Sequence, residues 1–233
     1  MSNVDRALGV LLDPGLAPIV DMVVRRTGDG TYEAASADGR VEFRRTRDHD
    51  VDGYERTGGD GQDPIADQSC DRLVGLTAEI ADPHPPRTTN SYPFAYDHIA
   101  QLFDHPAAPD LCVLHSGAHN WEDQGGHRGE HGSLGVVHAR APFVIAGRGI
   151  RNDGVVPRAG RLVDVAPTIA ELLGCAPDAD GHHLAGQDGV VRTDVLDGER
   201  PRHVVGFLFD GVNPNVLYAM AADRKSTRLN SSH

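Results

Sequence analysis

Five histidines fall within 24 residues of this chain, in a loop between two apolar runs. They are His115, His119, His127, His131 and His138. Three acids, Glu122, Asp123 and Glu130, lie among them together with several glycines. Imidazole and carboxylate groups suit Zn²⁺ or a similar divalent ion, and glycines let the backbone turn tightly beside a metal or a phosphate. The cluster therefore predicts a metal site with His131 as its best ligand candidate; an ordinary polar loop is the alternative.

A second candidate ligand lies near the C-terminal end. The apolar run HVVGFLF at residues 203–209 ends in Asp210 and Gly211, and Asn213 and Pro214 suit the cap and the first residue of a helix. A buried strand that presents an acid just before a helix is typical of active sites in α/β proteins. Asp210 is therefore predicted to lie in a site.

These residues need strands and helices to position them. Buried apolar runs at 111–115, 143–147 and 204–209 alternate with helical patterns, which predicts an α/β fold with a mainly parallel sheet and helices on both faces. Asp-Gly turns between short strands predict a small β-meander over residues 17–47 as an accessory region. Helices are expected over 4–12, 70–80, 96–104 and 166–173, and a solvent loop over the acidic, Gly-rich residues 47–64.

Composition excludes some classes of partner. A formal net charge of −12 argues against nucleic acid, because phosphate contacts need clustered Lys and Arg. The first 24 residues carry acids inside their apolar pattern, unlike a signal peptide, and no apolar run approaches the roughly 20 residues of a membrane helix. We therefore expect a cytoplasmic protein without a nucleic-acid scaffold or a membrane partner.

The His-rich loop and the segments after it resemble a known family. The stretch HRGEHGSLGVVHARAPFVIAGRGI, followed by RLVDVAPTIAELLG, is similar to the C-terminal part of the alkaline phosphatase superfamily, nearest its type I phosphodiesterase/nucleotide pyrophosphatase branch. The match spans residues 110–174, and HVVGFLFDGVNPNVL at 203–217 resembles the first core strand of the same superfamily.

The resemblance implies a site with two divalent ions, zinc by expectation, and a phosphoester small molecule as substrate. It places a late metal ligand on His131 and an early one on Asp210, and it implies a Thr or Ser nucleophile beyond Asp210 that this chain does not contain. The usual Asp-His pair before the late histidine is not evident. His115, His119 and His127 are therefore possible replacement ligands, and the three acids of the loop are expected to be solvated.

The order of these parts departs from the family. The C-terminal portion, residues 1–200, precedes the start of a second or permuted core at 201–222, and tandem and permuted arrangements both stay open. Residues 223–233 resemble a translated sequencing adaptor, which implies a gene model assembled from environmental DNA.

Three functions are consistent with this pattern. The first is a fragment of a metal-dependent phosphoric ester hydrolase, inactive alone and packed on the missing remainder of its protein. The second is a non-catalytic, degenerate phosphatase-like module that packs on an active domain. The third is a sulfatase-like relative that keeps the metal scaffold.

Overall fold

The computed structural model describes residues 2–48, 51–119 and 133–230. The chain divides into two compact units. The first comprises Met1–Ala141 and Gly211–His233, and the second Pro142–Asp210.

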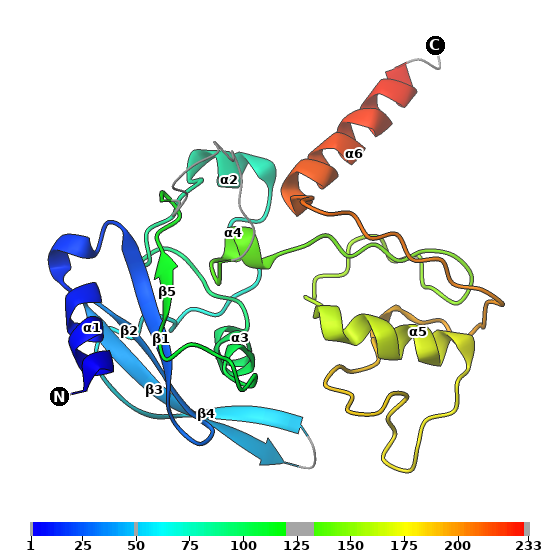
Figure 1. Ribbon diagram of the computed structural model, residues 1–233. Coiled ribbons are helices and arrows are strands. Elements are labelled where there is room, and N and C mark those ends of the chain that lie inside the picture. The colour runs from blue at the N-terminus through cyan, green and yellow to red at the C-terminus, as the bar shows by residue number, and fades with distance from the viewer. Residues whose placement is uncertain (1, 49–50, 120–132, 231–233) are drawn as a thin grey trace. The chain divides into compact units, whose positions relative to one another are not determined.

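A five-stranded sheet forms the centre of the first unit (Figure 1). Its order is β4-β3-β2-β1-β5, and every neighbouring pair is antiparallel. The strands are β1 (Val20–Gly28), β2 (Thr31–Ser36), β3 (Gly39–Asp48), β4 (Val51–Gly61) and β5 (Cys112–His115). Tight turns join β1 to β2 and β2 to β3. Gly30 in the first turn has a φ of +63°, which a residue without a Cβ adopts at least cost.

The predicted α/β fold, with a mainly parallel sheet and helices on both faces, was wrong. The strands expected in the accessory meander do form, but they are the middle of an antiparallel sheet. Residues 47–64, expected to be a solvent loop, instead supply β4, because backbone hydrogen bonds to β3 need no apolar side chains.

Two apolar runs that were expected to be buried strands are not strands. Residues 142–147 and 203–209 lie outside regular structure, and Phe207 and Leu208 are 80% and 95% exposed. A short apolar run shows that a segment is suited to burial, but it does not specify a partner strand.

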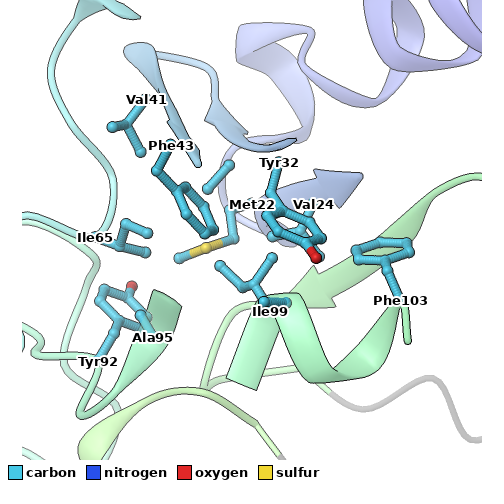
Figure 2. Packing of buried hydrophobic residues seen from close by; sticks show 12 residues of the cluster. Met22, Val24, Tyr32, Val41, Phe43, Ile65, Tyr92, Ala95, Ile99 and Phe103 are labelled. Carbon is cyan, nitrogen blue, oxygen red and sulfur yellow. The ribbon is translucent and has the colours of Figure 1, made fainter. Parts of the chain in front are cut away.

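The main core lies on the face of the sheet that α3 (Ala95–Leu102) covers (Figure 2). Met22 and Val24 point to this face because side chains alternate along a strand. Phe43 is fully buried, and its ring centroid lies 5.4 Å from that of Tyr32. Ile99 reaches the same cluster from α3.

A smaller core lies on the opposite face, under α1 (Asn3–Leu11). Leu8 packs there against Val23 and Ala35. Ser2 caps the helix by a reciprocal pair of bonds: its hydroxyl accepts from the Asp5 backbone N–H at 3.1 Å, and the Asp5 carboxylate accepts from the Ser2 N–H at 3.0 Å. The helix expected over residues 4–12 is thus confirmed.

Three further α-helices and one 3₁₀ turn complete the described part of this unit. They are η1 (Pro14–Leu16), α2 (Leu76–Ala81), α4 (Val136–Ala139) and α6 (Pro214–Asn230). The predicted cap of α6 is confirmed, because the Asn213 Oδ1 accepts from the Val216 N–H at 3.1 Å. Asn215 fastens the start of α6 to the chain before α2: it accepts from the Gly75 N–H and donates to the Leu73 carbonyl, at 2.9 and 3.0 Å.

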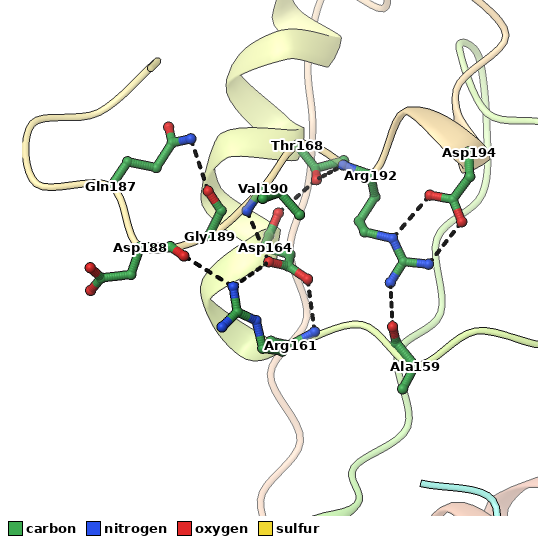
Figure 3. A network of polar contacts seen from close by, with 10 residues as sticks. All are labelled: Ala159, Arg161, Asp164, Thr168, Gln187, Asp188, Gly189, Val190, Arg192 and Asp194. Carbon is green, nitrogen blue, oxygen red and sulfur yellow. Dashed lines mark hydrogen bonds and ion pairs between the residues drawn. The ribbon is translucent and has the colours of Figure 1, made fainter. Parts of the chain in front are cut away.

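The second unit is organised around α5 (Val165–Leu173), which ends at Gly174 in the left-handed conformation. Two 3₁₀ turns, η2 (Leu162–Asp164) and η3 (Thr193–Val195), flank it. The buried Asp164 accepts hydrogen bonds from the N–H groups of Arg161 and Val190, at 2.9 and 3.0 Å (Figure 3). Side-chain bonds therefore hold this loop-rich unit where sheet hydrogen bonds are lacking.

Candidate functional site

A cavity of about 350 Å³ opens in the first unit where β1 begins and β5 ends. The Pro-rich segment 83–90 and the residues around α4 form its other walls. We call it the imidazole cavity, because three histidines line it beside a buried acid, an arginine and an asparagine. These residues are Asp21, His84, Arg87, Asn90, His115 and His138.

A β-bulge brings Asp21 to the cavity. Val20 pairs with His115 and Met22 pairs with Leu114, so Asp21 is an extra residue of β1 opposite β5. Bulges re-aim a side chain out of the regular alternation of a strand. The Asp21 carboxylate accepts a hydrogen bond of 2.8 Å from the buried Tyr92 hydroxyl.

Burial dominates the electrostatics of this pair. It raises the pKa of Asp21 above its usual value, although the Tyr92 hydrogen bond and the nearby charge of Arg87 oppose the rise. Burial, together with the Asp21 charge, also raises the pKa of Tyr92, which remains a hydroxyl donor at neutral pH.

His115 is the last residue of β5, and its ring is held in one tautomer. Its Nδ1 lies 2.9 Å from the carbonyl oxygen of Ser116. Because a carbonyl only accepts, Nδ1 carries the proton and the lone pair of the neutral ring is on Nε2. Histidines that bind metals are commonly oriented by such a bond to the backbone.

His138 and His84 supply the other two imidazoles. Burial lowers the pKa of His138, and the nearby His115 and His84 lower it further. His138 is therefore neutral at pH 7, the form in which imidazole binds a metal. His84 lies beside the end of β5, since a Cβ added at Gly117 would meet the His84 Cα at 3.5 Å.

His119 lies next to the cavity and contacts Ser116. The Ser116 hydroxyl donates to the Pro18 carbonyl at 2.8 Å, and its oxygen is 2.9 Å from the His119 Nδ1. Because the hydroxyl donates its hydrogen to the Pro18 carbonyl, its oxygen accepts from the His119 Nδ1–H instead of donating to this nitrogen. The pair is therefore not arranged as a nucleophile and its general base, in which the hydroxyl must donate.

The structure places only part of the predicted site. His115 and His138 line the cavity and His119 adjoins it, whereas His127 and His131 lie outside the described residues, as do the three acids of the loop. Asp210 is exposed and belongs to the second unit. Among the residues that the structure describes, no three His, Cys, Asp or Glu side chains are grouped so that they could hold a metal ion.

The sequence reasoning missed four residues of the cavity, Asp21, His84, Arg87 and Asn90. Asp21 left a signal, because it is an acid inside the apolar run IVDMVV. His84 and Arg87 flank Pro85 and Pro86, and the prolines exclude a helix from this segment. Prolines restrict the backbone of a connecting segment, so side chains on it can be held in fixed positions beside a site. Such a connection is therefore a candidate for functional residues.

No protein-family model, no curated protein and no solved structure matches this chain. No helix in the described ranges is both long and apolar enough to cross a membrane. Function has to be argued from the site itself.

Proposed function

We propose that this chain is part of a metal-dependent phosphoric ester hydrolase of the phosphodiesterase or nucleotide pyrophosphatase type, located in the cytoplasm. The observation that carries the proposal is the convergence of His84, His115 and His138 with the buried Asp21 on one cavity. These side chains come from segments far apart in the sequence, and titratable groups that converge in a cleft mark candidate functional sites.

The chemistry of these groups suits part of a zinc site. The backbone carbonyl that orients His115 and the lowered pKa of His138 both favour imidazole as a ligand. A bound zinc ion would polarise a phosphoryl oxygen and lower the pKa of a nucleophile. His127 and His131 are the remaining ligands that we propose, and two ions would fill a complete site.

One observation favours a second candidate, the non-catalytic module that packs on an active domain. It is the exposed apolar segment with Val205, Phe207, Leu208 and Phe209, all at least 72% exposed. Exposed apolar surface of this kind marks sites of protein contact.

Zinc binding separates the two candidates. Isothermal titration of the full chain with Zn²⁺ is compared with His115→Ala and His138→Ala, and the exposed His203→Ala serves as the matched control. The hydrolase predicts stoichiometric zinc in the wild type, at least about tenfold weaker binding in the two cavity variants and no change in the control. No zinc uptake by the wild type would refute the metal site and leave the module as the better account.

A further inference from the structure

Arg87 stands out on the wall of the imidazole cavity. Its side chain is only 9% exposed, and its Nη2 donates to the carboxylate of Asp38, which lies in the turn between β2 and β3. Its Nε is buried and has no hydrogen-bond partner among the described residues. A buried, charged donor without a partner is costly, so it points to a group that completes the site.

Arg192, in the second unit, shows what a completed guanidinium edge looks like. Its Nε and Nη2 each donate to one carboxylate oxygen of Asp194, both at 2.9 Å (Figure 3). These two nitrogens form the planar fork that fits a carboxylate or a phosphate. At Arg87 only one nitrogen of the same edge is bonded: Nη2 donates to Asp38, and Nε has no partner among the described residues.

The other groups near Arg87 permit an anion. Asp38 is half exposed, so the ligand of Arg87 is a carboxylate that water can solvate once it is displaced. Asp21 is the other nearby acid, and the Tyr92 hydroxyl already donates to it. Asn90, His84 and His138 line the same cavity, and an amide or imidazole N–H can donate to further oxygens.

We propose that Arg87 is the binding residue for a tetrahedral oxyanion, the phosphoryl group of a small ligand, which takes both Nε and Nη2 and displaces Asp38. A phosphoryl group has oxygens to spare for Asn90 or an imidazole after two have bound Arg87, whereas a carboxylate uses both of its oxygens on the fork. The inference deepens the proposed hydrolase, since it names the residue that would hold the phosphoester, but phosphate binding itself needs no metal.

The test is titration of the metal-free full chain with inorganic phosphate and, separately, with acetate, in a chelator and at constant ionic strength. Arg87→Gln removes the charge and the fork, and we expect it to weaken phosphate binding by about ten- to a hundredfold, the equivalent of a lost charged hydrogen bond. Asp38→Asn removes the competing anion and should tighten phosphate binding several-fold. Arg148→Gln, at an arginine whose side chain is 68% exposed, is the matched control and should bind as the wild type does.

The two variants are expected to shift phosphate affinity in opposite directions, which distinguishes an effect on binding from damage to the fold. Unchanged phosphate binding in Arg87→Gln, weaker binding in Asp38→Asn, or acetate bound as tightly as phosphate would overturn the proposal. If Arg87→Gln fails to fold, Asp38→Asn decides alone, because it alters an exposed carboxylate. Lack of zinc uptake would refute the hydrolase and leave this anion site standing, whereas lack of phosphate binding by the wild type would refute the anion site and leave zinc binding untouched.

Discussion

Replacement of Asp164 by Ala should open the second unit locally. Asp164 is 4% exposed, and its carboxylate accepts from two backbone N–H groups, those of Arg161 at 2.9 Å and Val190 at 3.0 Å. The Arg161 guanidinium lies 3.8 Å away and adds charge stabilisation. The change removes a hydrogen-bond acceptor from each of these two amides.

The magnitude follows from those two bonds. A hydrogen bond to a charged group contributes about 1.5–3 kcal/mol, and neighbouring bonds are not fully additive, so we expect a loss of about 3–5 kcal/mol. Asp164→Asn keeps one carbonyl oxygen as acceptor and should lose about half as much. At 1.4 kcal/mol for each factor of ten, the Ala variant should exchange these amides about a hundredfold to several thousandfold faster.

Hydrogen exchange of the Arg161 and Val190 amides is the assay. Residues 142–210 contain neither tryptophan nor tyrosine, so near-ultraviolet absorbance and fluorescence would miss the opening. Asp188→Ala is the matched control, because its carboxylate is exposed and only its backbone carbonyl bonds Arg161. Equal exchange in Asp164→Ala and Asp188→Ala would refute the view that this carboxylate holds the unit together.

Two further predictions concern the core and acid stability. Phe43→Ala should lower the free energy of unfolding of the first unit by about 3–5 kcal/mol in denaturant titration, because the ring is fully buried. Val10→Ala, at a residue that is 65% exposed, is the control and should change this free energy little. Similar losses in both variants would contradict the assigned core. The Arg192 hydrogen bonds lower the pKa of Asp194 from 3.8 to about 2, so the stability from this pair is present above pH 4 and lost as pH falls through about 2. Asp194→Asn should remove that part of the acid dependence of exchange around Arg192, and an unchanged profile would count against the pair.

Local features were predictable from the sequence. The helix under the Ser2 cap, the tight turns around β2 and the Asn213 cap of α6 all form. Each depends on a few neighbouring residues, whose backbone conformations and side-chain bonds favour one structure whatever surrounds them. Within the site, the sequence singled out His115, His119 and His138 because they belong to a dense local cluster.

The tertiary structure decided which strands pair and which residues meet. Apolar residues 203–209 read as a buried strand yet remain outside any sheet, while the polar residues of β4 are held by pairing to β3. Strand pairing depends on contacts between segments that are distant in the sequence, so a local pattern cannot predict which segments pair. The imidazole cavity has the same origin: a bulge re-aims Asp21, a proline-rich segment carries Arg87, and His138 arrives 117 positions after Asp21. Only the folded chain brings such residues to one cavity, because interactions between sequence neighbours do not determine which distant segments come together.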